Sequence, residues 1–367
     1  MKKSELKWIL KYAGAFAACV IGSGFATGQE ILQFFGSYGY WSFAVVGVNL
    51  LGFLLVGKTL LTRGYDHRGQ GSFQHYEYYC GKRIGKLYAV LVPLTLLLIT
   101  AVLISAAGAT IEQYYGLNRY LGAGLMGLLV LAANLLGFEK LVKVVAPIGT
   151  AIILFSIFVG VYTVVRDFRG LSAVQNELDA LRTYQAAPHW TISAVLYLSL
   201  NFLSSSPYYT ALGASARSYK SAKWGAILGA VALVLTIAIM NLAIVLHAGD
   251  AGTLAVPTLS LATSISGVFG NVFALVLMLG IFSATATTLW SFCSGFFKND
   301  RRKNRYFSIG TIVVCMALGF LPFGKLMAVV YPLIGYIGLY FVACVIVKGL
   351  KREAQPAAAS SSGAAEK

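Results

Sequence analysis

Gly22, Ser23 and Gly24 interrupt an apolar stretch that runs from about Trp8 to Phe35. A glycine weakens a helix by roughly 1 kcal/mol relative to alanine, so two of them predict local unwinding. Unwound backbone exposes N–H and C=O groups that lipid cannot satisfy. Such backbone is tolerated in a membrane only inside the protein or beside a water-filled cavity. The interruption therefore predicts a binding site.

The two sides of this break differ in polarity. The N–H groups at the start of the outer half, from Phe25 onward, suit a carboxylate, because a helix N-terminus carries free donors and the positive end of the helix dipole. Glycine also lets the backbone approach a ligand closely. The carbonyl groups around Ala18 and Ile21, which end the inner half, point the opposite way and suit a cation.

A second polar set occupies residues 284–288, where Ala284 precedes hydroxyl side chains inside another apolar stretch. Hard cations take oxygen ligands, which neutral hydroxyl and carbonyl groups can supply. Thr287 and Thr288 are therefore candidate sodium ligands. The alternative is structural, because threonines in membrane helices commonly bond back to the carbonyl four residues earlier.

The elements that carry these motifs are membrane helices. The chain has 367 residues, of which 58% are hydrophobic and 11% are charged, unlike a soluble domain. About 20 apolar residues span the hydrocarbon core, and ten stretches qualify as spans. They are approximately residues 8–35, 40–61, 87–115, 120–138, 141–165, 190–214, 224–247, 270–297, 306–321 and 326–347.

The distribution of positive charge orients these spans. The net charge of +16 could suggest nucleic acid, but an even number of spans with the amino terminus inside leaves few basic residues outside. This asymmetry is the positive-inside rule and predicts cytoplasmic termini in a cell membrane, with no nucleic-acid partner. The outer segments hold only Arg119, Arg166, Arg169, Arg182 and Lys325.

The spans divide into two halves, about residues 8–165 and 190–347, with five spans each. An odd number of spans per half inverts the second half, as in an inverted repeat. The first span of each half should then be broken. Residues 203–207 supply the second break, since Ser204 and its neighbours precede Pro207, which lacks an N–H and disrupts a helix. A kinked helix with serines bonded to their own backbone is the alternative.

These motifs resemble the amino acid–polyamine–organocation superfamily with the LeuT-type fold, and within it the YkvI-like amino-acid permeases. The resemblance rests on residues 21–25, 198–202 and 284–288, and its topology covers about residues 8–347. It implies an all-α membrane protein with ten transmembrane helices in a 5+5 inverted repeat, in which helices 1 and 6 are broken. The helices of spans 1, 2, 6 and 7 would move against the rest during alternating access.

The resemblance also assigns residues to a site. Backbone N–H groups of Ser23, Gly24 and Phe25 would bind a substrate carboxylate, and side chains from the sixth span would line the pocket. The expected substrate-binding residues are Gly22, Ser23, Gly24, Phe25, Tyr197, Ser199, Phe202, Ser204 and Phe292. The expected sodium ligands are Ala18, Ile21, Ala284, Thr287 and Thr288. One sodium is expected, because a second site wants Asn where this chain has Phe25.

Two acids and two lysines leave the coupling ion open. Glu30 and Glu112 lie within predicted spans, where an ionisable group is a functional hypothesis by default. They are candidates for gating or proton coupling, although solvation or pairing, for example of Glu30 with Lys325, is the alternative. Lys140 and Lys143 would be the amines of a proton-coupled relative, but their place near the cytoplasmic end favours sodium.

The sequence thus predicts a sodium-coupled symporter that imports an amino acid or similar small zwitterion. The alternatives are a proton-coupled transporter or exchanger of the same fold and, in another class, a non-transporting sensor or channel-like pathway. No enzymatic constellation, P-loop, metal cluster or cofactor other than the coupling sodium ion is expected. We expect residues 1–353 to form one transporter domain and residues 354–367 a disordered tail. Substrate identity and oligomeric state stay open.

Overall fold

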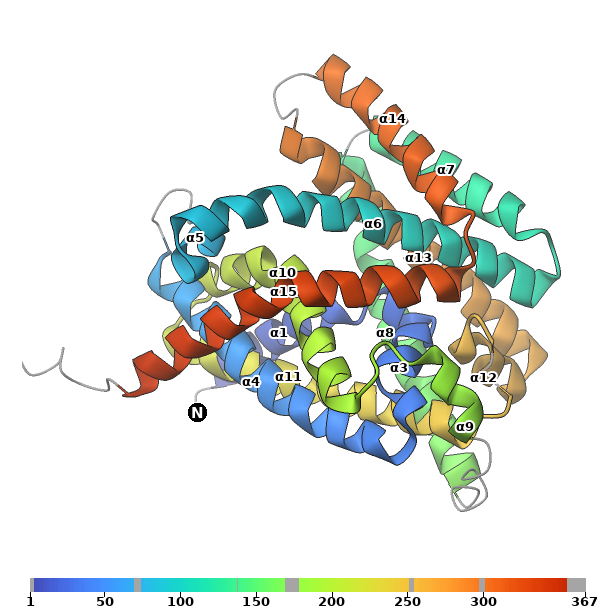
Figure 1. The fold of residues 1–367 in the computed structure, drawn as a ribbon, viewed down its shortest axis with the longest axis horizontal. Coiled ribbons are helices and arrows are strands. Elements are labelled where there is room, and N and C mark those ends of the chain that lie inside the picture. The colour runs from blue at the N-terminus through green and yellow to red at the C-terminus, as the bar shows by residue number, and fades with distance from the viewer. Residues whose placement is uncertain are drawn as a thin grey trace, which may run out of the picture.

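The computed structural model describes residues 3–68, 74–136, 138–168, 178–250, 254–296 and 301–354. Within these ranges the chain forms helices and turns but no strand, so the predicted all-α class is confirmed. The two longest helices, α6 and α15, lie side by side along the molecule (Figure 1). The predicted tail, apart from Ala354, lies outside the described residues.

The first half of the chain supplies the helices that correspond to the first five predicted spans, together with short segments between them. They are α1 (Lys3–Val20), α2 (Ser23–Ala26), α3 (Gln29–Phe34), the 3-10 helix η1 (Gly36–Trp41), α4 (Ser42–Asp66), α5 (His75–Cys80), α6 (Lys82–Tyr115), α7 (Arg119–Leu136) and α8 (Phe138–Asp167).

The second half begins after a connection that holds two short helices. Its elements are α9 (Leu178–Leu181), the 3-10 helix η4 (Arg182–Tyr184), α10 (Trp190–Ala214), α11 (Tyr219–Leu246), α12 (Pro257–Ile265), α13 (Gly267–Phe296), α14 (Arg301–Gly319) and α15 (Phe323–Ala354). Each predicted span therefore coincides with helical structure.

Five helices in the described ranges are long and apolar enough to cross a membrane, as judged by length and composition. They are Gly36–Asp66, Lys82–Tyr115, Tyr219–Leu246, Gly267–Cys293 and Phe323–Lys351. A shorter apolar helix covers Arg119–Leu135. The chain is thus a multi-span membrane protein, and the other predicted spans are helices that are interrupted, more polar, or described only in part.

The predicted break in the sixth span is wrong, because α10 is continuous through Pro207. Pro207 has no N–H to donate to the carbonyl oxygen of Leu203. That oxygen instead accepts a hydrogen bond of 2.8 Å from the Tyr76 hydroxyl of α5, and the Ser206 hydroxyl lies 3.4 Å away. Since the freed carbonyl is satisfied from outside the helix, the helix continues.

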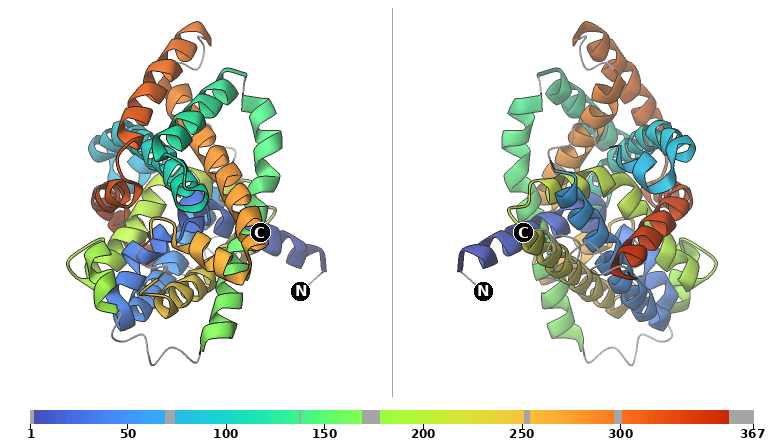
Figure 2. Two further views of the ribbon diagram at one scale, coloured as in Figure 1. Left: turned by 90° about the vertical axis from the view of Figure 1, so that its right-hand side faces the viewer. Right: turned by 90° about the vertical axis from the view of Figure 1, so that its left-hand side faces the viewer.

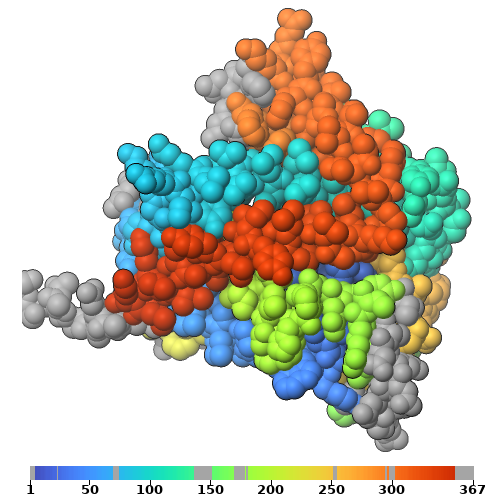
Figure 3. All heavy atoms as spheres, viewed as in Figure 1, coloured from blue at the N-terminus to red at the C-terminus, as the bar shows by residue number. Residues whose placement is uncertain are grey.

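The helices form two groups that meet along a central seam. In one group α10 packs against α4, α1 packs against α11, and α11 packs against α4. In the other, α6 contacts α7, α13 and α14, and α13 contacts α8, which also packs against α11 of the first group. The second group includes α7 and α14, which lie together at one edge of the molecule (Figure 2). Helix α15 contacts both groups, and with α6 and α10 it covers one face (Figure 3).

Small residues allow α4 and α10 to pack at close range. A Cβ atom added to Gly64 would lie 2.1 Å from the carbonyl oxygen of Thr210, and one added to Gly213 would lie 2.0 Å from that of Leu61. Each glycine therefore faces the backbone of the other helix. This packing mode is common among membrane helices, where close backbone approach stabilises association.

Ion pairs join helix ends that the sequence places on the same side of the membrane. Lys220 at the start of α11 pairs with Glu5 of α1 at 3.4 Å, and both were predicted on the inner side. On the predicted outer side, Asp167 accepts hydrogen bonds from Arg166 and lies 2.9 Å from Nε2 of His247. The pairing agrees with the predicted alternation of the spans.

Candidate functional site

The interruption of the first span is confirmed at the point where α1 ends. Helix α1 ends at Val20 and α2 begins at Ser23. The Gly22 amide donates to the carbonyl oxygen of Val20 at 2.8 Å. A regular helix would direct that amide to Ala18. The Ala18 carbonyl therefore lacks its usual helical donor, as its predicted role in binding a cation requires.

A second interruption, which the sequence analysis missed, separates α2 from α3. Gly28 has a φ of 79° in this turn, a conformation that favours glycine. Thr258 at the start of α12 reaches the turn: its hydroxyl donates to the Ala26 carbonyl, and its amide donates to the Thr27 carbonyl at 3.3 Å. Helix α12 thus packs on the outer half of the first span.

The outer half of the first span is enclosed, whereas its inner half is not. Every residue from Gly24 to Gly39 is buried. In α1, by contrast, Gly14 and Ala18 are exposed and Cys19 is half-buried. The structure is therefore closed around the outer half of this span.

A cavity of about 170 Å³ lies at the break in the first span. Its walls come from both helix groups: from α1, α2, α3 and α10 on one side, from α6 and α13 on the other, and from α15. The lining residues are Cys19, Val20, Gly22, Gly24, Phe25, Glu30, Ile99, Leu103, Leu200, Asn201, Ser204, Ser205, Ala284, Thr288 and Tyr331. This placement at the seam makes the cavity the candidate functional site.

The cavity brings together about half of the residues predicted for the site. The predicted residues that line it are Gly22, Gly24, Phe25, Glu30, Ser204, Ala284 and Thr288. The predicted residues outside its lining are Ala18, Ile21, Tyr197, Ser199, Phe202, Thr287, Phe292 and Glu112. The side chain of Ser23 lies outside the described part of the structure.

The two threonines predicted as sodium ligands differ in their position relative to the cavity. Thr288 lines the cavity. Its hydroxyl lies 2.9 Å from the Ala284 oxygen and 3.0 Å from the Thr285 oxygen of its own helix, and it accepts a hydrogen bond of 3.0 Å from the Thr100 hydroxyl of α6. The Thr287 hydroxyl bonds only to its own helix, at 2.9 Å from the Ala284 oxygen and 3.0 Å from that of Ser283. Thr288 is therefore better placed than Thr287 to face an ion in the cavity.

Glu30 of α3 is the acid of the cavity, and its exposed fraction is 6%. A Cβ atom added to Gly24 would lie 3.0 Å from Oε2 of Glu30 and 2.9 Å from the hydroxyl of Tyr331. Gly24 therefore leaves the space in which these two groups stand. Lys325, the proposed partner of Glu30, is exposed and does not pair with it.

Tyr197 stands behind Glu30 instead of lining the cavity. Its ring packs between Phe34, Phe35 and Phe53, with ring centres 4.8 to 6.4 Å apart. Its buried hydroxyl interacts with the Glu30 carboxyl group, although no acceptor in the described part of the chain lies within 3.5 Å in hydrogen-bond geometry. The Ser199 hydroxyl is likewise buried without a partner. Tyr197 thus supports the wall behind Glu30.

Two aromatic residues predicted for the pocket belong to the packed core. Phe202 of α10 contacts Phe53, with ring centres 5.0 Å apart. Phe292 stacks on Phe307 of α14 at 5.6 Å. Neither ring reaches the cavity, because each faces a neighbouring helix instead of the seam.

Several lining residues carried little signal in the sequence. Asn201 and Ser205 lie within the predicted sixth-span motif and could have been added on spacing alone. Tyr331 precedes Pro332 in α15, but the chain has many tyrosines, and nothing in the sequence marks this one as a site residue. Ile99 and Leu103 lie one turn apart on α6 and resemble any apolar pair. Their position depends on how α6 crosses the first span, which the sequence does not encode locally.

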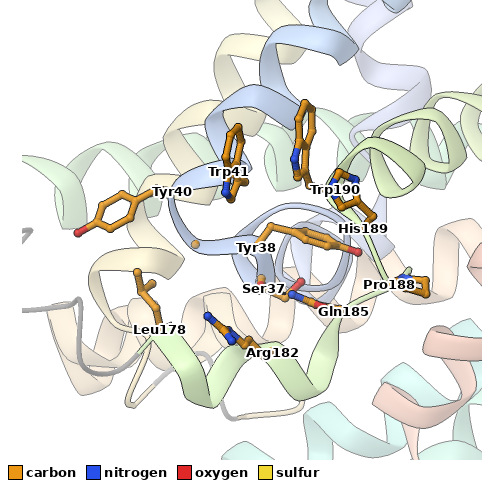
Figure 4. Close-up of a pocket in the computed structure, with 11 residues that line it drawn as sticks. Ser37, Tyr38, Tyr40, Trp41, Leu178, Arg182, Gln185, Pro188, His189 and Trp190 are labelled. Atoms are coloured by element: carbon orange, nitrogen blue, oxygen red, sulfur yellow. Dashed lines mark hydrogen bonds between the residues drawn. The ribbon is translucent and has the colours of Figure 1, made fainter.

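A larger cavity of about 560 Å³ lies on the predicted outer side, between η1 and the segment that leads into α10 (Figure 4). Trp41 and Trp190 stack at its rim, with ring centres 5.2 Å apart and planes 7° from parallel. Trp41 is 60% exposed, as is usual for aromatic residues at a membrane interface. None of the predicted site residues lines this cavity.

Other predicted features lie away from the central cavity. Glu112, at the outer end of α6, is exposed and lines a small outer cavity of about 100 Å³ that also includes Arg119. The side chains of Lys140 and Lys143 lie outside the described part of the structure. In the described ranges, no three His, Cys, Asp or Glu side chains cluster closely enough to hold a metal.

No protein-family model matches the chain. Two proteins of Bacillus subtilis are similar to it over nearly their whole length. The uncharacterized membrane protein YkvI is 25% identical over 354 residues, which cover 93% of this chain and 96% of YkvI. The uncharacterized protein YyaD is 22% identical over 348 residues, which cover 94% and 97% of the two chains.

Solved structures of transporters share the arrangement of helices. Mhp1 in its inward-facing conformation aligns with a TM-score of 0.61 and 12% identity, over 96% of this chain and 78% of Mhp1. A mutant of the manganese transporter of Eremococcus coleocola aligns with a TM-score of 0.58 and 15% identity, over 95% and 80% of the two chains. The chain therefore has the all-α, LeuT-type fold that the sequence predicted.

Proposed function

We propose that this protein is a secondary active transporter that imports an amino acid or similar small zwitterion by alternating access. The observation that carries the proposal is the cavity at the break in the first span, where both helix groups contribute walls. A site at such a seam is exposed to opposite sides when one group moves against the other. The transporter fold of the solved neighbours supports the same class of function.

Sodium is the proposed coupling ion. Support comes from the Thr288 hydroxyl in the cavity and from the Ala18 carbonyl, which the break releases from its helical bond. These groups lie on α13 and α1, in different helix groups, so an ion that bridged them would favour one relative position of the groups. Each positive charge that moves inward also gains about 2.3 kcal/mol per 100 mV of membrane potential.

Proton coupling is the second candidate, and the placement of Glu30 in the cavity favours it. A carboxyl group enclosed between helices can carry a proton across as the groups move. The two candidates differ in one measurement: uptake that persists without sodium and collapses with a protonophore selects the proton.

The test is uptake of labelled amino acids into proteoliposomes that contain the full-length protein, with and without a sodium gradient. Accumulation against a concentration gradient that depends on sodium supports the proposal. Binding without accumulation would instead indicate a sensor, and currents far above a carrier's turnover would indicate a channel. If no amino acid binds or moves, the proposed substrate is wrong.

A further inference from the structure

The carboxyl group of Glu30 is enclosed in the cavity without a cationic partner. The cavity lining contains no lysine, arginine or histidine, and none of the ion pairs in the described ranges includes Glu30. The titratable groups that interact with it are the hydroxyls of Tyr197 from α10 and Tyr331 from α15. A buried carboxylate is costly unless a proton neutralises it or a cation compensates it, so a cationic group bound beside Glu30 would remove that cost.

The position of Glu30 changes the polarity expected at the break. Oε2 of Glu30 stands 3.0 Å from the place where a Cβ atom of Gly24 would be. A substrate carboxylate bound to the Gly24 amide would therefore lie beside another carboxylate, which repels it. Helix α2 has only four residues, so its dipole offers little to offset that repulsion. A positively charged group fits this place better.

The hydroxyl groups of two buried tyrosines lie near the Glu30 carboxyl group. The Tyr331 hydroxyl lies 2.9 Å from the place where a Cβ atom of Gly24 would be, and Oε2 of Glu30 lies 3.0 Å from that place. The Tyr197 hydroxyl is fully buried and interacts with the Glu30 carboxyl group, although no acceptor among the described residues lies within 3.5 Å in hydrogen-bond geometry. A buried hydroxyl donor is costly without an acceptor, and the Glu30 carboxyl group is an acceptor that adjoins it. Aromatic rings near a carboxylate also favour ammonium groups.

Resting on the proposed transport function, we propose that Glu30 binds the ammonium group of the substrate, with Tyr197 and Tyr331 positioning the carboxylate. The substrate class is small organic ammonium compounds, in which the positive group is required and a carboxylate is not. The cavity volume of about 170 Å³ lies below the range of about 300–1,000 Å³ typical of drug-sized ligands and matches a compound of few heavy atoms.

The test compares matched probes on the purified full-length protein. Dissociation constants are measured for the common amino acids and, whatever their outcome, for unbranched alkylamines from ethylamine to pentylamine. For each amino acid that binds, the amine that lacks its carboxylate and the acid that lacks its amine are added. We expect the amine to bind and the acid not to. We expect Glu30→Gln to weaken amine binding at least tenfold, while Glu112→Gln leaves it unchanged.

Each outcome supports or overturns the inference. Binding of the acid without the amine overturns it, and so does unchanged amine affinity in Glu30→Gln. If Glu30→Gln keeps its amine affinity and loses only the dependence of uptake on sodium or protons, Glu30 acts on the coupling ion. That result also overturns the inference. If no amino acid binds or moves but alkylamines bind through Glu30, the inference stands and the proposed substrate fails.

A second variant keeps the test decisive if Glu30→Gln does not fold. Glu30→Asp retains the charge but withdraws it by one methylene group. If the carboxylate binds the ammonium group, this variant should shift the preference toward longer alkylamines. If Glu30 has only a structural role, the order of preference along the alkylamine series should stay as in the unmodified protein.

Discussion

The hydroxyl of Tyr76 donates a hydrogen bond of 2.8 Å to the carbonyl oxygen of Leu203. Tyr76 lies on the short inner helix α5, and Leu203 lies four residues before Pro207 in α10. The bond replaces the donor that the proline removes. A side chain 127 residues away in sequence thus keeps the sixth span continuous.

Removing this hydroxyl should destabilise the protein. Tyr76→Phe leaves the Leu203 carbonyl with only a weak partner, at a cost of about 1–3 kcal/mol for an unsatisfied buried group. Thermal unfolding in detergent measures the loss, with Tyr306→Phe at an exposed position as the control. In a Pro207→Ala background the restored amide should make Tyr76→Phe nearly neutral. An equal cost in both backgrounds would contradict the assignment.

Adding a methyl group at Gly24 should disrupt the cavity without unfolding the protein. Gly24→Ala places a Cβ atom about 3 Å from both Glu30 and Tyr331 and must displace one of them. We expect substrate affinity to fall roughly tenfold, about 1.4 kcal/mol. Gly14→Ala on α1, which meets no atom within 4 Å, is the control for glycine replacement. Unchanged affinity in Gly24→Ala would show that substrate does not use this place.

The two threonines of α13 should differ in their effect on sodium. Thr288→Ala removes a hydroxyl from the cavity, so the sodium concentration for half-maximal uptake should rise at least roughly tenfold. Thr287→Ala should have a smaller effect, because Thr287 does not line the cavity and its hydroxyl bonds to its own helix. Thr285→Ala, buried in the same helix, controls for loss of a threonine. Unchanged sodium dependence in the Thr287→Ala, Thr288→Ala double variant would refute the ion site.

The contact between α4 and α10 should not accept a larger side chain. Gly64→Ala would place a Cβ atom 2.1 Å from the Thr210 oxygen, and backbone cannot yield as a side chain can. Overpacking of this kind costs about 1–3 kcal/mol or more. Gly47→Ala, on the same helix but with nothing within 4 Å, should leave thermal stability unchanged or raise it. Equal melting temperatures for the two variants would contradict the close packing.

The outer cluster around Asp167 should respond to acid. The hydrogen bond from Arg166 holds the pKa of the Asp167 carboxyl below its ordinary value of 3.8, and His247 adds to the effect. Because the folded-state pKa is lowered, this group stabilises the fold above pH 3.8, and the stabilisation is lost as pH falls through the lowered pKa. Asp167→Asn should therefore melt below the unmodified protein at pH 7, with a gap that narrows below pH 3.8.

The size of that gap should be small, because the Asp167 side chain is 29% exposed. Arg166→Gln is a second test. It removes the principal cause of the lowered pKa of Asp167, so the melting temperature should then depend less on pH. A gap that is constant between pH 7 and pH 3 would show that the cluster does not stabilise through its charge.

The sequence analysis located the helices well because an apolar span is a local property. The break near Gly22 was equally accessible, since two glycines act on their own turn. Pro207 failed as a predictor because its effect depends on Tyr76, a contact that no local pattern reveals. Phe292 failed for a related reason: the direction of a ring on an all-apolar helix depends on which neighbour packs there. Glu30 was noticed because an acid is unusual in an apolar span. Its proximity to Gly24 could not be predicted, because it depends on the turn at Gly28.

The unequal continuity of α1 and α10 has a mechanical consequence. The first span of one repeat is interrupted twice near its middle, whereas α10 stays helical throughout and lacks only the backbone bond that Pro207 cannot make. Bending stiffness therefore differs between the two halves. The inner part of the first span can tilt without carrying α3 with it, whereas α10 transmits a displacement along its whole length. In such a molecule, bending is concentrated in a few residues around Gly22 and Gly28, next to the central cavity.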